Sequence, residues 1–207
     1  MSVVEEVLER SRVLPVVAVD DAAVVDDLCG ALLEGGISCI EITFRTDAAV
    51  AAIERATRVE GMLVGAGTVL TVEQAHAAAH AGARFAVAPG TDADVVGACA
   101  DAGLPFFPGI ATPSELGHAA RLGCSTVKVF PAATLGGPAF LRAVSATFPH
   151  ARFIPTGGVD AGSLPAYLAV PSVLACGGSW ICETALVREG RFDEITRRAR
   201  AAFEAAA

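Results

Sequence analysis

Lysine is almost absent from this sequence, and acidic residues outnumber basic ones. Lys128 is the only lysine among 207 residues, the other fourteen strong bases are arginines, and the net charge is −8. No basic stripe with interleaved aromatic residues is present, so we expect no nucleic acid partner. An anionic metabolite is not excluded, because backbone amides and a few polar side chains suffice to hold a small phosphate.

Long hydrophobic runs and paired cysteines are also missing. No uninterrupted apolar run approaches the roughly 20 residues that span a bilayer, so we expect no membrane association. Glu5, Glu6 and Glu9 interrupt the N-terminal segment where a signal peptide would need an apolar stretch. The six cysteines are widely spaced and form no C-x-x-C pair. These features predict a cytoplasmic protein with reduced thiols.

Short β-like segments alternate with Ala-rich amphipathic stretches along the whole chain. Strand–helix alternation with short turns is typical of a parallel sheet. Eight units in this length predict one domain over residues 1–207, an α/β fold of the (β/α)8 TIM barrel type. An open doubly wound sheet is the alternative, but the even spacing favours closure. The eight segments are Leu14–Val19, Cys39–Thr43, Leu63–Gly67, Phe85–Ala88, Phe106–Pro108, Thr126–Phe130, Phe153–Thr156 and Val173–Cys176.

Several helices carry recognisable ends. Thr71 is followed three residues later by Gln74, and Thr112 by Glu115, in the pattern of a capping box. The first dozen residues predict an extra N-terminal helix that covers the N-terminal end of the barrel, and a final helix begins at Phe192. Glycines that end helices just before the next strand are Gly35, Gly36, Gly82, Gly103 and Gly123.

Side-chain alternation aims one acid and one base into the predicted barrel. Glu41 alternates with isoleucines in Cys39–Thr43, and Lys128 alternates with valines in Thr126–Phe130. Because β-branched side chains suit the helix-packed exterior, both charged side chains should project inward. A desolvated lysine amine can lose its proton and attack a carbonyl, which a guanidinium cannot do. The pair is therefore either catalytic or a buried ion pair that only fixes the core.

The ends of the other strands carry residues suited to a substrate. Arg45 follows Glu41 by four positions, where a guanidinium fork could hold a carboxylate, although a solvated loop arginine would look the same. Gly65-Ala66-Gly67-Thr68 ends the third strand and permits close backbone approach to a ligand. Pro89-Gly90 and Pro108-Gly109 end the next two strands as sharp turns.

Two glycine pairs follow the last two strands. The chain reads Thr156-Gly157-Gly158 after the seventh strand and Gly177-Gly178-Ser179 after the eighth. Barrels often build a phosphate site at these two strand ends from backbone N–H groups and a helix N-terminus. The two pairs together predict a phosphate-binding site.

In order and in spacing, the motifs resemble the family of 2-keto-3-deoxy-6-phosphogluconate (KDPG) aldolases, which includes 4-hydroxy-2-oxoglutarate (KHG) aldolases. The resemblance covers nearly the whole chain. Its segments are Glu41-Ile42-Thr43-Phe44-Arg45-Thr46, Gly65-Ala66-Gly67-Thr68-Val69-Leu70, Pro89-Gly90, Pro108-Gly109, Lys128-Val129-Phe130-Pro131-Ala132, Thr156-Gly157-Gly158-Val159 and Gly177-Gly178-Ser179-Trp180.

The resemblance implies a class I (Schiff-base) lyase of the Entner–Doudoroff pathway that cleaves KDPG to pyruvate and glyceraldehyde 3-phosphate. It also implies a homotrimer, with no cofactor and no metal. Lys128 would form the Schiff base and Glu41 would transfer protons. The implied substrate contacts are Arg45 and Thr68 at the carboxylate, Pro89, Phe130 beside the imine, Thr156 at substrate oxygens, and Gly157, Gly158, Gly178 and Ser179 around the phosphate.

Other functions stay open beside this one. The natural substrate could be KHG, which lacks the phosphate, or the galactonate epimer of KDPG. A second class is a barrel that binds a sugar phosphate without chemistry, for which neither Glu41 nor Lys128 would be needed. The chain departs from many relatives at Val19-Asp20-Asp21, where those have a basic residue. His76 and His80 are four residues apart, but without a third ligand we predict no metal site.

Overall fold

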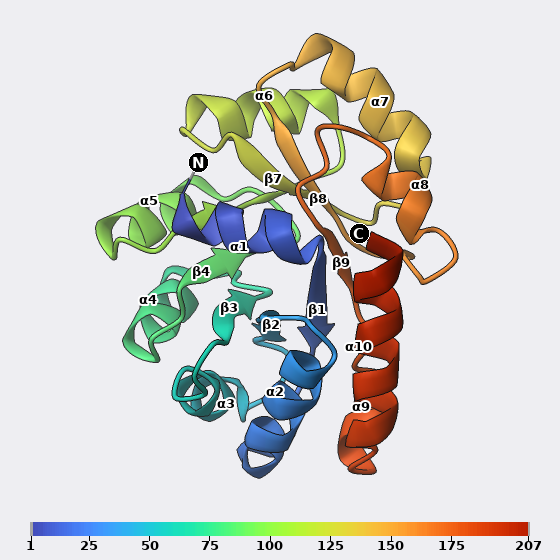
Figure 1. Cartoon of the computed structure of the whole chain (residues 1–207). Helices are drawn as coiled ribbons and strands as arrows, with labels where there is room; N and C mark the ends of the chain where they lie inside the picture. Colours follow the sequence, from blue (N-terminus) through green and yellow to red (C-terminus); the bar gives the residue numbers. More distant parts are fainter. Residues whose placement is uncertain (1, 207) are drawn as a thin grey trace.

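The computed structural model describes residues 2–206, in which strands and helices alternate. Figure 1 shows the helices arranged around the outside of the strands. The strands are β1 (Val13–Val17), β2 (Cys39–Thr43), β3 (Leu63–Gly67), β4 (Phe85–Val87), β5 (Phe106–Phe107), β6 (Gly109–Ile110), β7 (Thr126–Val129), β8 (Arg152–Pro155) and β9 (Cys176–Gly178). The helices are α1 (Val3–Ser11), the 3₁₀ helix η1 (Ala22–Val24), α2 (Val25–Glu34), α3 (Ala49–Ala56), α4 (Val72–His80), α5 (Ala93–Asp101), α6 (Pro113–Arg121), α7 (Gly137–Thr147), α8 (Leu164–Leu168), α9 (Thr184–Arg188) and α10 (Phe192–Ala206).

The strands pair in parallel, as the strand–helix alternation predicts. Six of them form one sheet in the order β5-β4-β3-β2-β1-β9, and three form a second sheet in the order β6-β7-β8. Only Pro108 separates β5 from β6, and an isolated bridge joins Thr156, just after β8, to Gly177 of β9. The predicted α/β class is therefore confirmed, with a curled parallel sheet wrapped by helices.

Two predicted strands have different bounds in the structure. The fifth, Phe106–Pro108, is interrupted at Pro108, because proline has no N–H for a ladder hydrogen bond, and its course resumes as β6. The eighth was placed at Val173–Cys176, but β9 starts at Cys176 and includes Gly177 and Gly178, which pair with β1. The expectation that these glycines form a turn was wrong, because their missing side chains let neighbouring groups pack closely on the strand.

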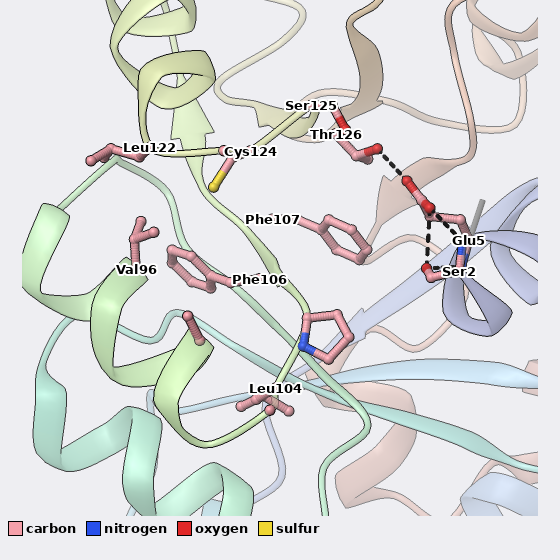
Figure 2. Close-up of a pocket in the computed structure, with 14 residues that line it drawn as sticks. Ser2, Glu5, Val96, Leu104, Phe106, Phe107, Leu122, Cys124, Ser125 and Thr126 are labelled. Carbon is pink, nitrogen blue, oxygen red and sulfur yellow. Dashed lines mark hydrogen bonds between the residues drawn. The ribbon is translucent and has the colours of Figure 1, made fainter.

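Helix α1 lies across the starts of β7 and β8, where the sequence predicts a cover for the N-terminal end. Its apolar face buries Val4 and Leu8. Glu5 accepts a hydrogen bond of 2.6 Å from the Thr126 hydroxyl at the start of β7, and Figure 2 shows this contact beside a surface pocket. Glu9 pairs with Arg152 at the start of β8, at 2.7 Å.

The predicted helix ends are mostly as expected. Thr112 and Glu115 form a complete capping box at the start of α6. At α4, Thr71 accepts from the Gln74 backbone N–H, but the Gln74 side chain accepts from Leu70 rather than from Thr71. Four of the predicted helix-ending glycines adopt positive φ, namely Gly36, Gly82, Gly103 and Gly123.

The hydrophobic core fills the space between the strands and the helices around them. Alanine and branched aliphatic residues dominate it. Because alanine is small, the helices can approach the sheet closely. All six cysteines lie within residues 2–206 and are free, and every one except the half-buried Cys124 is buried. No helix in residues 2–206 is both long and apolar enough to cross a membrane.

Candidate active site

A cavity of about 310 Å³ lies at the carboxyl ends of the strands. It brings together every residue to which the family resemblance assigns a role, from strand ends that lie far apart along the chain, whereas Gly177 of the second glycine pair does not line it. Three further residues, Val16, Thr43 and Val159, also line it without a predicted role. The complete lining is Val16, Glu41, Thr43, Arg45, Thr68, Pro89, Lys128, Phe130, Thr156, Gly157, Gly158, Val159, Gly178 and Ser179.

Lys128 and Glu41 face each other at the centre of this cavity. The Lys128 Nζ lies 3.0 Å from Glu41 Oε1, and their side chains are 6% and 0% exposed. Both project inward from their strands, as the alternation predicts. Within residues 2–206, the second carboxylate oxygen of Glu41, Oε2, is buried without a hydrogen-bond partner. One oxygen therefore holds the amine, and the other is left to accept a proton from a bound molecule.

Gly67 on the neighbouring strand β3 gives the Glu41 side chain its room. Thr43 and Gly67 are register partners, as are Glu41 and Gly65. A Cβ atom at Gly67 would lie 2.5 Å from Glu41 Cγ and 2.7 Å from Cδ, closer than side chains pack. The glycine that the sequence suggested for ligand approach therefore accommodates the carboxylate instead.

The rim of the cavity after β2 and β3 carries Arg45 and Thr68. The Arg45 Nε–H donates a hydrogen bond of 3.1 Å to the Thr43 hydroxyl. Thr68 has φ of 58°, in the left-handed region. That conformation is costly for a β-branched residue, and such strain is concentrated at binding sites.

Phe130 and the first glycine pair form the opposite wall. The ring centroid of Phe130 lies 5.9 Å from Lys128 Nζ, and Phe130 is 39% exposed although it is a large aromatic residue. Gly157 has φ of 92°, and a Cβ there would come within 3.1 Å of the Phe130 ring. Packing of the turn against the ring therefore requires glycine at this position.

The turn after β8 offers unpaired backbone donors. Gly158 has φ of 76°, and in the described part of the chain the N–H groups of Gly158 and Val159 donate to no protein acceptor. A Cβ at Gly178 would collide with the Trp180 ring, and one at Gly177 with the Thr156 hydroxyl. Unpaired N–H groups in such a turn suit a bound anion.

The thiols on neighbouring strands are poor nucleophiles. Burial raises the pKa of Cys39 on β2 and of Cys176 on β9 to about 12. Both thiols therefore stay protonated near neutral pH, and a protonated thiol is neither a strong nucleophile nor a metal ligand. Lys128 is the residue in the cavity with a nucleophilic amine.

Residues without a predicted site role lie elsewhere in the molecule. His76 and His80 are exposed on α4, and in residues 2–206 no three His, Cys, Asp or Glu side chains gather as a metal site would require. In the acidic segment Val19-Asp20-Asp21, Asp20 forms an ion pair with Arg188 at 2.6 Å on the surface. The negative charge of Asp20 is therefore compensated by Arg188, the last residue of α9.

A curled parallel sheet with a paired lysine and carboxylate at its carboxyl end has the architecture of an α/β enzyme. A family model described as "KDPG and KHG aldolase" matches residues 4–198. The chain therefore belongs to the KDPG and KHG aldolase family, and the resemblance predicted from the sequence is confirmed.

Individual relatives cover nearly the whole chain. A 2-dehydro-3-deoxy-phosphogluconate aldolase of Treponema pallidum is 46% identical over 95% of this chain and 94% of its own length. A KHG/KDPG aldolase of Escherichia coli is 39% identical over 98% and 95%. The structure of KDPG aldolase from Legionella pneumophila, with pyruvate captured as a covalent carbinolamine, superimposes with a TM-score of 0.91 at 37% identity, over 96% of this chain and 97% of that one.

Proposed function

We propose that this chain is a class I aldolase that cleaves KDPG to pyruvate and glyceraldehyde 3-phosphate through a Schiff base on Lys128. The observation that carries the proposal is the buried contact of 3.0 Å between Lys128 Nζ and Glu41 Oε1 inside the cavity. The family and the names of its 37–46% identical relatives support the substrate class. A buried lysine paired with an acid in a cavity suits amine attack on a carbonyl.

The reaction begins when Glu41 takes a proton from Lys128 and the resulting amine bonds to C2 of the keto acid. Glu41 passes this proton to the carbonyl oxygen as the C=O π bond breaks. The nitrogen then returns one proton to Glu41, which leaves a neutral carbinolamine. Glu41 supplies the proton that lets this hydroxyl leave as water, which produces the iminium. Glu41 then removes the proton of the C4 hydroxyl, the C3–C4 bond breaks, and its electrons pass into the iminium. The aldehyde leaves, the enamine is protonated at C3, and water releases pyruvate and Lys128.

The remaining cavity residues hold the two ends of the substrate. Arg45 and Thr68 bind the carboxylate of the keto acid, and the fork geometry of a guanidinium suits that group. The aromatic ring of Phe130 and the ring of Pro89 flank the imine, and Thr156 contacts substrate oxygens. The phosphate is held by Gly157, Gly158, Gly178 and Ser179, where the unpaired Gly158 N–H supports the assignment.

Residues 1–207 form one domain in this proposal, and the two sheets close into a (β/α)8 barrel. The bridge between Thr156 and Gly177 and the single residue between β5 and β6 support closure. The homotrimer and the cytoplasmic location come with the family resemblance, and the free thiols suit a reducing compartment.

The experiment that tests this function is reductive trapping. The protein is mixed with pyruvate, reduced with borohydride, and digested for peptide mass spectrometry. A single adduct is expected on Lys128, because the chain contains no other lysine side chain. Trapping without pyruvate is the control. If folded protein yields no adduct, the chain is a sugar-phosphate-binding barrel whose lysine is structural, and the aldolase proposal fails.

KHG is the second candidate substrate, because the E. coli relative carries both activities in its name. KHG lacks the phosphate, so it would not use the phosphate contacts assigned to Gly157, Gly158, Gly178 and Ser179. Cleavage rates on KDPG and KHG at equal concentration separate the two candidates. A rate on KHG equal to that on KDPG would remove the assigned phosphate site from the mechanism.

A further inference from the structure

Thr43 lines the cavity without a role in the scheme above. It is the last residue of β2, 1% exposed, and lies two positions beyond Glu41. We propose that Thr43 is a positioning residue that aims the Arg45 guanidinium at the substrate carboxylate. The inference rests on the proposed function, in which Arg45 binds that carboxylate.

Two hydrogen bonds fix the direction of the Thr43 hydroxyl. Its oxygen donates to the Val17 carbonyl at 3.0 Å and accepts from Arg45 Nε–H at 3.1 Å. A carbonyl can only accept and a guanidinium can only donate, so the single hydroxyl hydrogen must point to Val17. The hydroxyl lone pair is then committed to Arg45, and the end of β1 sets the position of the guanidinium.

This contact restrains a side chain that would otherwise be mobile. Arg45 is exposed on the turn after β2, and a long exposed side chain loses considerable rotamer freedom when it is fixed. Thr43 binds Nε alone. Within residues 2–206, Nη1 and Nη2 of Arg45 have no protein partner, so both stay available to a carboxylate. Preorganisation of this kind improves binding because the ordering cost is met before the substrate arrives.

The test measures how borohydride trapping of pyruvate depends on pyruvate concentration. Thr43→Val keeps the volume of the side chain and removes the hydroxyl. We expect about a tenfold rise in the half-saturating pyruvate concentration, which corresponds to ~1.4 kcal/mol, with the trapping rate at saturation unchanged. Thr43→Ser keeps both hydrogen bonds and should recover most of the affinity lost in Thr43→Val.

A double-mutant cycle with Arg45→Ala separates positioning from general structural damage. If Thr43 acts through Arg45, then adding Thr43→Val to Arg45→Ala changes the half-saturating concentration by less than twofold. An equal tenfold effect in both backgrounds would overturn the inference, as would an unchanged value in Thr43→Val alone.

Folding is controlled separately, because Thr43→Val leaves the Val17 carbonyl without its donor. If that variant does not fold, Thr43→Ala replaces it in the cycle, since the vacated space admits a water to that carbonyl. The wild-type protein tests the proposed function. If trapping yields no Lys128 adduct in the wild type, both proposals are overturned. A trapped wild type with an unaffected Thr43 variant overturns only the role of Thr43.

Discussion

In the proposed mechanism, Lys128 supplies chemistry that no other side chain of this protein can replace. Arginine at this position keeps a positive charge opposite Glu41 but cannot form an imine. We expect Lys128→Arg to lose cleavage by on the order of 10⁴-fold or more, the scale on which loss of a covalent nucleophile acts, with near-native circular dichroism. Lys128→Met should instead lower stability by about 3–5 kcal/mol in urea unfolding, because it leaves the buried Glu41 carboxylate unpaired. If Lys128→Arg cleaved faster than about 10⁻⁴ of the wild-type rate, the covalent mechanism would be contradicted.

Because Gly67 has no side chain, it leaves the Glu41 carboxylate room to contact Lys128. In Gly67→Ala the new Cβ would overlap the Glu41 side chain, so the carboxylate must move away from Lys128. A displacement of about 1 Å can cost on the order of 10²-fold in rate, and we expect kcat for KDPG cleavage to fall by that factor.

Gly97 on α5 is the matched control for Gly67. It is an exposed helical glycine with no atom within 4 Å of an added Cβ. Gly97→Ala should keep full activity and raise stability by about 0.5–1 kcal/mol, because glycine is unfavourable inside a helix. Equal kcat values for the two variants would contradict the clearance role of Gly67.

At the scale of single elements, the attachment of α1 depends on a carboxylate. Burial tends to raise the pKa of Glu5, but hydrogen bonds from Ser2 and Thr126 outweigh it and lower the pKa below its usual 4.5. A carboxyl with a lower pKa in the folded state stabilises the protein above the unfolded pKa, and this contribution is lost as the pH falls through the folded pKa.

Glu5→Gln should therefore lower Tm at pH 7 and lose this effect at acid pH. The difference in Tm from wild type is expected to be constant above about pH 5 and to shrink as the pH falls below 4.5. Glu6→Gln is the control, since in the described part of the chain the Glu6 side chain forms no hydrogen bond. A Tm difference that stays constant down to pH 2 would assign the effect of Glu5 to packing instead.

Strand ends were the least predictable part of the elements. The composition of Phe106–Pro108 indicated a strand, but only the missing N–H of Pro108 explains the break between β5 and β6. Gly177 and Gly178 resemble a turn in the sequence and yet pair with Leu14 and Pro15. Whether a glycine pair turns or extends depends on what packs against it, which here is Thr156 and Trp180.

At the scale of the whole molecule, hydrogen exchange can test whether the barrel closes. The Leu174 N–H donates to the Phe153 carbonyl at 2.9 Å, which joins β8 to the segment before β9. If the barrel closes here, the Leu174 amide should exchange only through global unfolding, with the same free energy as the amides of β2. The Gly158 and Val159 N–H groups, which donate to no protein acceptor in the described part of the chain, supply fast amides as the internal reference. An opening free energy for Leu174 that lies several kcal/mol below the global value would contradict closure.

The sequence by itself determined the alternation of strands and helices and the inward direction of Glu41 and Lys128. These features follow from local rules, because side chains alternate along a strand whatever the strand packs against. The sequence also indicated Lys128, the only lysine, as the candidate nucleophile. The strand ends that line the site were recognisable for a similar reason, since the motifs Gly65-Ala66-Gly67-Thr68 and Thr156-Gly157-Gly158 lie next to their own strands.

Only the tertiary structure decided which groups meet. Lys128 and Glu41 are 87 positions apart, and the link from Val17 through Thr43 to Arg45 spans two strands. The clearance that Gly67 leaves for Glu41 likewise depends on strand register. Contacts of this kind depend on how separate strands are placed side by side, and no pattern within one segment specifies that placement.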